Sequence, residues 1–124
     1  MYACTVSKRA DGELELEVLH ILWGSQQPLH IGEVQELLES NLAYTSVATV
    51  LARLTTKELV QRKPFGRSYV YEPAISHDDW YSGKMMALLH ETSNHRMLLA
   101  GFVSKLSSKD RLALQSLLSE EKEA

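Results

Sequence analysis

The sequence predicts a mostly α-helical fold that carries one small β-hairpin, and three observations lead to this prediction. Apolar residues recur with helical spacing through three segments before residue 58. Two short strand-like stretches follow, on either side of a turn that contains proline and glycine. Residues 75–124 return to helical patterns. A length of 124 residues fits one domain with a small assembly element.

The first helix is expected over residues 12–23, with Asp11 as its N-cap and Gly24-Ser25 at its end. The second is expected from Ile31 to about Ser40-Asn41, and Glu33 is placed to reach back to its N-cap in a capping box. Both have an apolar stripe that should face a core. The stripes are Leu14, Val18, Ile21 and Leu22 in the first helix and Ile31, Val34, Leu37 and Leu38 in the second.

The third predicted helix, from Tyr44 to Lys57, has two contrasting faces. One face is apolar and should be buried, because its residues are spaced i, i+3, i+4 and i+7: Val47, Val50, Leu51 and Leu54. Exposed helix faces usually carry long, solvated side chains, whereas the opposite face here is small and rich in hydroxyls. A surface that must approach another molecule closely would explain that choice. This face holds Thr45, Thr49, Ala52 and Thr56, flanked by Ser46, Ala48 and Arg53.

Residues 59–63 and 68–72 are predicted as the strands of a hairpin that turns through residues 64–67. Its basic side chains are Arg62, Lys63 and Arg67. Three helices followed by a hairpin within about sixty residues make a winged helix-turn-helix. The hairpin would then be the wing.

The distribution of charge indicates where this arrangement would meet a partner. The net charge is −3, yet residues 41–72 carry five basic and two acidic side chains, against two basic and seven acidic in residues 1–40. A basic patch favours nucleic-acid phosphates. Residues 1–74 are therefore predicted to form a DNA-binding domain.

The individual roles follow from side-chain chemistry. The hydroxyls and methyls of Thr45, Ser46 and Thr49 suit base edges in the major groove. The cations of the hairpin suit flanking phosphates, which set affinity and register but carry no sequence information. Arg53 and the Tyr44 hydroxyl are better placed for the DNA backbone than for a base.

Residues 75–124 are predicted to form a helical dimerisation domain. Ser76 with Asp79, and Ser107 with Asp110, match capping boxes that begin two helices, His77–Glu91 and 109–121. We expect the first helix to turn Trp80, Met85, Leu88 and Leu89 inward, and the last to present Leu114, Leu117 and Leu118 as one stripe. Short helices cannot bury this much apolar surface alone, so a second copy should cover it. A two-fold dimer would require an operator with a dyad.

Composition narrows the other function classes. No apolar run is long enough to cross a membrane, and residues 1–10 hold no hydrophobic segment typical of a secretion signal. A single cysteine, Cys4, forms no intramolecular disulfide, and a cytoplasmic location is expected. No phosphate-binding loop, zinc-protease motif or serine-hydrolase elbow is present, so no catalytic residue and no cofactor is predicted.

Three stretches resemble the BlaI/MecI/CopY family of penicillinase-type repressors: residues 12–23, residues 43–54 with their Tyr-Thr-x-Val-x-Thr-Val-Leu-x-Arg-Leu run, and residues 67–73. The resemblance covers roughly residues 11–120. It implies a winged helix, a helical dimerisation domain, operators with a TACA…TGTA-type dyad, and repression of β-lactam resistance or stress genes. The family positions that contact DNA correspond to Tyr44, Thr45, Ser46, Ala48, Thr49 and Arg53.

The resemblance also implies a mode of inactivation. In penicillinase repressors, a protease activated by a membrane sensor cuts the dimerisation helices beside a phenylalanine. The matching bond is Gly101–Phe102, with Gly101 where the family usually has asparagine. The alternative is that Phe102 serves as a residue of the dimer core.

Two other functions remain open from the sequence. A metal-responsive winged-helix regulator could use His77 with Asp78 and Asp79, or Glu91 with His95 at i, i+4 spacing. Isolated pairs of this kind are more often surface decoration, and no metal site is predicted. A winged-helix module for protein contacts would show no salt-dependent DNA binding.

Overall fold

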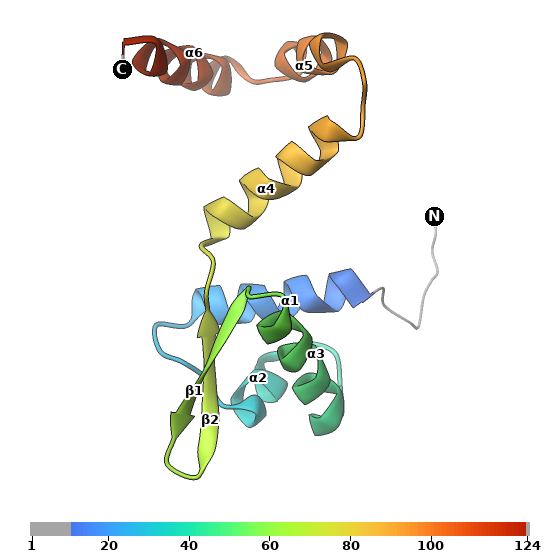
Figure 1. The fold of residues 1–124 in the computed structure, drawn as a ribbon, viewed down its shortest axis with the longest axis vertical. Helices are drawn as coiled ribbons and strands as arrows, with labels where there is room; N and C mark the ends of the chain where they lie inside the picture. The colour runs from blue at the N-terminus through green and yellow to red at the C-terminus, as the bar shows by residue number, and fades with distance from the viewer. Residues whose placement is uncertain (1–10, 124) are drawn as a thin grey trace. The chain divides into compact units, whose positions relative to one another are not determined.

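The computed structural model describes residues 11–123, so the N-terminal segment with Cys4 lies outside the described residues. The chain divides into two compact units, Met1–Trp80 and Tyr81–Ala124. Figure 1 shows the helices and the hairpin, which confirm the predicted mostly α-helical fold with a small β-hairpin. The elements are α1 (Asp11–Gly24), α2 (Ile31–Leu37), α3 (Tyr44–Thr56), β1 (Val60–Phe65), β2 (Ser68–Pro73), α4 (His77–His90), α5 (His95–Ser104) and α6 (Ser108–Glu123).

The core of the first unit lies where α1, α2, α3 and the hairpin meet. The predicted inner face of α3 is buried in full, because each of its four apolar residues is at most 3% exposed. This leaves the outer face of α3 in solvent. The core cluster consists of Val18, Leu19, Leu22, Val34, Leu38, Val47, Val50, Leu51, Leu54, Val60 and Tyr71.

Helix α2 begins as predicted and ends earlier. The His30 backbone N–H donates to Glu33 Oε1 at 2.8 Å, which confirms that half of the capping box. The expected end at Ser40-Asn41 is wrong, because Leu38 is already extended (φ −70°, ψ 135°). The extended backbone buries Leu38, which is 7% exposed, and turns Leu37 into solvent at 57%.

The hairpin has a tighter turn than predicted. Pro64 and Phe65 belong to β1 and pair with Tyr69 and Ser68, so the turn consists of Gly66 and Arg67. Gly66 has a φ of 63°, which suits glycine at the first central position of a type II′ turn. Pro64 is tolerated because β1 lies at the edge of the described sheet, where a proline nitrogen can face away from its partner strand.

An isolated bridge without a signal in the sequence pattern joins the hairpin to the loop before α2. Leu29 and Tyr71 exchange backbone hydrogen bonds of 2.9 and 2.8 Å. The aromatic ring of Phe65 meets the His30 ring edge-on at 5.4 Å, and Ser68 Oγ lies 3.3 Å from His30 Nδ1. The wing is therefore braced against the start of α2.

Helix α3 ends in a Schellman motif. The Leu59 N–H donates to the Leu54 carbonyl, and the Glu58 N–H donates to the Thr55 carbonyl, both at 3.0 Å. The residue in the left-handed position of this motif is Glu58, with a φ of 65°. Glycine is the residue that adopts this conformation most readily, so Glu58 is strained here.

An aromatic cluster connects α1 to the first turn of α4. Trp23 Nε1 donates to the Ile75 carbonyl at 2.9 Å. The Trp23 ring also lies 5.3 Å from His20, 5.1 Å from His77 and 6.2 Å from Trp80, in edge-on contacts. These contacts place the beginning of α4 in the first unit.

Helices α4 and α6 start where their capping residues predict, whereas the burial of side chains in the second unit differs from that expected. The Asp79 and Asp110 N–H groups donate to Ser76 and Ser107 Oγ at 3.0 and 3.1 Å. Met85 and Leu88, expected to face inward, are exposed, and no side chain from 81 to 121 is buried. A single copy of three short helices supplies too little surface to cover them. None of the helices in residues 11–123 is both long and apolar enough to span a membrane.

Candidate nucleic-acid interface

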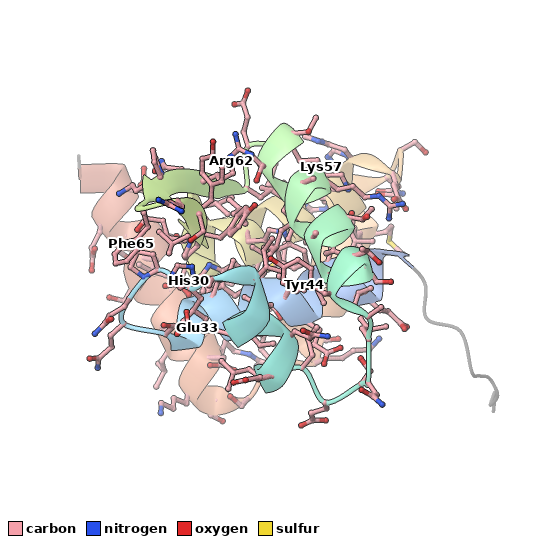
Figure 2. The ribbon with its side chains drawn as sticks, turned by 90° about the horizontal axis from the view of Figure 1, so that it is seen from below. His30, Glu33, Tyr44, Lys57, Arg62 and Phe65 are labelled. Atoms are coloured by element: carbon pink, nitrogen blue, oxygen red, sulfur yellow. The ribbon has the colours of Figure 1, made fainter. Side chains whose placement is uncertain are left out.

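The exposed face of α3 presents the predicted base-reading side chains together. Viewed from below in Figure 2, α3 begins at Tyr44 and ends just before Lys57. Tyr44, Thr45, Ser46 and Thr49 are exposed, and Ala48 is half-buried. Because the Val/Leu face is locked in the core, these side chains keep their outward direction.

Two residues of this face already have partners. Thr49 Oγ1 donates its hydrogen to the Thr45 carbonyl at 2.9 Å, so its lone pairs remain available to accept a hydrogen bond. Arg53, one turn further along α3, is exposed but engaged in a contact. These partners influence which hydrogen bonds α3 can offer.

The hairpin carries three cations in different electrostatic settings. The Arg62 guanidinium stacks on the Tyr69 ring at 3.9 Å, which fixes the direction of its donors. Lys63 Nζ forms an ion pair with Glu72 Oε2 at 2.6 Å. Arg67 lies in the exposed turn and has no ion-pair partner among the described residues. Arg62 and Arg67 therefore present more available charge than Lys63.

An ion pair stabilises the C-terminal end of α3. Lys57 Nζ, just after the helix, lies 2.8 Å from Glu15 Oε1 on α1, and Glu15 is buried. The pair joins the end of α3 to the first helix of the same unit. It also offsets one of the five positive charges of residues 41–72.

Phe65 was assigned to the turn by the sequence analysis, although it is an exposed aromatic of β1. It is 63% exposed and lies beside His30, as Figure 2 shows. The alternation of side chains along a strand is the sequence signal that could have predicted the exposure of Phe65. Val60 and its i+2 and i+4 neighbours share one face of β1, whereas Phe65 lies on the opposite face with Lys63.

The candidate cleavage bond and the candidate metal ligands belong to α4, α5 and the segment between them, outside α3 and the hairpin. Gly101 and Phe102 are inside α5, and Phe102 is 43% exposed. His77 Nδ1 lies 3.3 Å from Asp78 Oδ1, and His95 begins α5. Within residues 11–123, no three His, Cys, Asp or Glu side chains are grouped so that they could hold a metal ion.

Comparison with known proteins gives three findings. A family model described as "Penicillinase repressor" matches residues 11–120. The "Transcriptional regulator BlaI" of Mycobacterium tuberculosis, from strains CDC 1551 / Oshkosh and ATCC 25618 / H37Rv, is 32% identical over 114 residues, which is 88% of this chain and 83% of the relative. The ferric uptake regulator Fur of Helicobacter pylori aligns in structure with a TM-score of 0.50 and 20% identity, over 54% of this chain and about half of that chain (49%). The last is a likeness of fold alone.

Proposed function

The chain belongs to the penicillinase repressor family, whose members are DNA-binding transcriptional repressors and not enzymes, and we propose that it acts as a homodimer on an inverted-repeat operator. The expected operator is a TACA…TGTA-type dyad, which follows from the family resemblance. A two-fold dimer would place its half-sites about one or two helical turns apart.

The observation that carries this proposal is the exposed hydroxyl face of α3. In the proposed complex, Thr45, Ser46 and Thr49 contact base edges in the major groove, and the half-buried Ala48 offers only a methyl group. Tyr44 and Arg53 contact the DNA backbone. An outer face with small side chains permits the close approach that base contacts require. The opposite, apolar face of α3 is packed in the core and holds the helix in place.

The wing has a separate role in the proposal. Arg62, Lys63 and Arg67 contact flanking phosphates, which supply affinity without sequence information. The stacked Arg62 and the unpaired Arg67 contribute most, because Lys63 is already neutralised by Glu72.

The proposed homodimer rests on the apolar surface of residues 75–124. We assign DNA binding to residues 1–74 and dimerisation to residues 75–124. In a single chain this surface is exposed, and a second copy would bury it. Its exposed apolar side chains include Met85, Leu88, Met97, Phe102 and Leu117.

The proposed inactivation is cleavage of the Gly101–Phe102 bond by a protease that a membrane sensor controls. The bond lies inside α5 (His95–Ser104), and proteases act on extended chain, so this helix must open locally before cleavage. Gly101 favours such opening, because glycine in a helix interior costs about 1 kcal/mol relative to alanine. The repressed genes would be β-lactam resistance genes. The protein would act in the cytoplasm, where chromosomal DNA lies.

Selection of bound fragments from random duplex DNA by the full-length protein tests the function. The expected consensus is a palindrome with TACA-like half-sites. Selected fragments without a dyad, or binding that does not weaken with rising salt, would refute the proposed mode of binding.

A further inference from the structure

We propose that α5 of one chain packs antiparallel against α6 of a second copy, with Arg96 paired to the partner's Glu121. This inference rests on the homodimer proposed above and adds a register to it. The starting point is an open cavity of about 850 Å³ in the second unit, lined by Arg96, Leu99, Ala100, Val103, Ser104 and Arg111.

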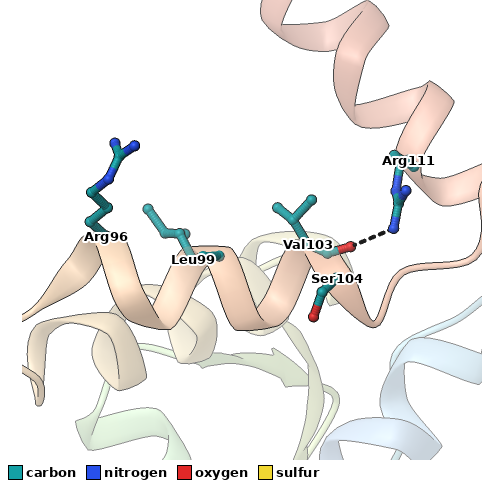
Figure 3. Close-up of a pocket in the computed structure, with 6 residues that line it drawn as sticks. Arg96, Leu99, Val103, Ser104 and Arg111 are labelled. Atoms are coloured by element: carbon teal, nitrogen blue, oxygen red, sulfur yellow. Dashed lines mark hydrogen bonds between the residues drawn. The ribbon is translucent and has the colours of Figure 1, made fainter.

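The cavity floor is one stripe of α5. Arg96, Leu99, Ala100 and Val103 follow i, i+3, i+4 and i+7 spacing, so they share a face about 10 Å long with a cation at its N-terminal end. In Figure 3, the side chains of Arg96, Leu99 and Val103 project from the same side of the helix. Arg111 Nη2 closes the opposite end by donating to the Val103 carbonyl at 3.2 Å.

Helix α6 carries the complementary stripe. Leu114, Leu117, Leu118 and Glu121 have the same i, i+3, i+4, i+7 spacing, with the charge at the C-terminal end and of opposite sign. Leu117 and Leu118 are 58% and 61% exposed. Antiparallel packing therefore places Leu114 against Val103, the two central leucines against Leu99 and Ala100, and the carboxylate against the guanidinium.

The charges at the ends of these stripes are available for the pairing. Among the described side chains, neither Arg96 nor Glu121 has an ion-pair partner, and both are exposed. Leu99 also lines the neighbouring apolar cavity of about 430 Å³ between α4 and α5. The proposed contact is thus continuous with the rest of the exposed apolar surface. By two-fold symmetry it occurs twice in each dimer.

A charge exchange between chains tests the register. Arg96→Glu puts two carboxylates at each contact of its own homodimer, and Glu121→Arg puts two cations there, so each variant should dimerise about tenfold more weakly than the wild type. Mixing the two variants gives a heterodimer in which both contacts have opposite charges again. The mixture should regain near wild-type affinity in sedimentation at several concentrations.

Glu120→Arg supplies the matched control. Glu120 lies next to Glu121 in sequence but about 100° around α6, so this variant should dimerise normally and should not rescue Arg96→Glu. Mixing also distinguishes a contact between two chains from a contact within one chain. If Arg96 and Glu121 paired within one chain, each variant would still lack the pair after mixing, and affinity would not recover.

Each result has a defined meaning. Suppose the wild type dimerises and neither Arg96→Glu nor Glu121→Arg weakens the dimer, or both weaken it and mixing does not restore affinity. Either result would overturn the register while leaving the homodimer intact. In the first case, something other than α6 of a second copy occupies the cavity. A wild-type protein that remains monomeric would overturn the homodimer itself.

Discussion

Lys57 Nζ lies 2.8 Å from the buried carboxylate of Glu15, and this ion pair joins the end of α3 to α1. Removing the lysine leaves a desolvated carboxylate without its cation, whereas removing the carboxylate leaves an ammonium that water can reach. We therefore expect Lys57→Met to lower the free energy of unfolding by about 1–3 kcal/mol.

The double variant gives the control for this pair. Glu15→Gln with Lys57→Met should be less destabilised than the sum of its parts by about 1 kcal/mol, as measured by urea denaturation. Strictly additive losses would show that the two groups do not stabilise the fold through each other.

Replacing Thr49 by valine should weaken operator binding about fivefold, equivalent to about 1 kcal/mol, because the side chain keeps its shape and loses its acceptor. Binding to DNA of unrelated sequence should not change. Thr56→Val is the matched control, since Thr56 lies on the same outer face of α3 two turns further along. Fluorescence anisotropy with both duplexes checks this, and an equal effect of the two substitutions would contradict the assigned role.

Arg67→Ala should weaken binding to all sequences alike and reduce the slope of log affinity against log salt by about 1. Lys63→Ala should have a smaller effect, because Lys63 already pairs with Glu72. Conversely, Glu72→Gln should release Lys63 and strengthen binding at low salt. Titrations at four or more salt concentrations check all three variants; equal slopes for wild type and Arg67→Ala would remove Arg67 from the interface.

Glu58→Gly should stabilise the protein by about 0.5–1 kcal/mol, because glycine adopts the left-handed conformation at the end of α3 without strain. Glu58→Ala removes the same charge but keeps the strain, so it should show no such gain. Thermal or urea unfolding distinguishes the two variants. A stability for alanine equal to that for glycine would assign the effect to charge.

Gly101→Ala should slow cleavage of the Gly101–Phe102 bond in cells exposed to a β-lactam, because alanine stabilises α5 by about 1 kcal/mol. The substitution fits, since an added Cβ would meet no atom within 4 Å apart from its chain neighbours and the backbone of its own helix. Gly83→Ala makes the same change in α4, also without a neighbour within 4 Å, and should leave the cleavage rate unchanged. Fragment mapping by mass spectrometry follows both variants. Cleavage elsewhere in the chain, or no cleavage with relief of repression, would refute the proposed site.

Local patterns made much of the first unit predictable. The burial of α3 followed from the spacing of Val47, Val50, Leu51 and Leu54, and the His30–Glu33 contact followed from a capping sequence. The candidate face on α3 was predictable for the same reason, because a helix fixes the direction of each side chain once its buried face is known. The exposure of its predicted base-reading hydroxyls agrees with that geometry.

Features that depend on distant partners were not predictable. Whether Leu37 or Leu38 enters the core depends on where the chain turns after α2, and a one-residue bridge such as Leu29–Tyr71 has no periodic signal. Phe65 was misassigned because proline and glycine nearby indicated a longer turn, while the register with β2 extended the strand. In the second unit, inward and outward faces cannot be distinguished by periodicity when the covering surface belongs to another chain.

The Leu29–Tyr71 hydrogen bonds and the contacts of His30 with Phe65 and Ser68 have a consequence for how DNA would be selected. They join the hairpin to the start of α2, and α2 packs on α3, so hairpin and α3 form one rigid body with a fixed separation. A protein with two contact points at fixed spacing fits duplexes whose groove width already matches, or which deform at little cost. Base pairs that no side chain touches would then influence operator choice through their stiffness.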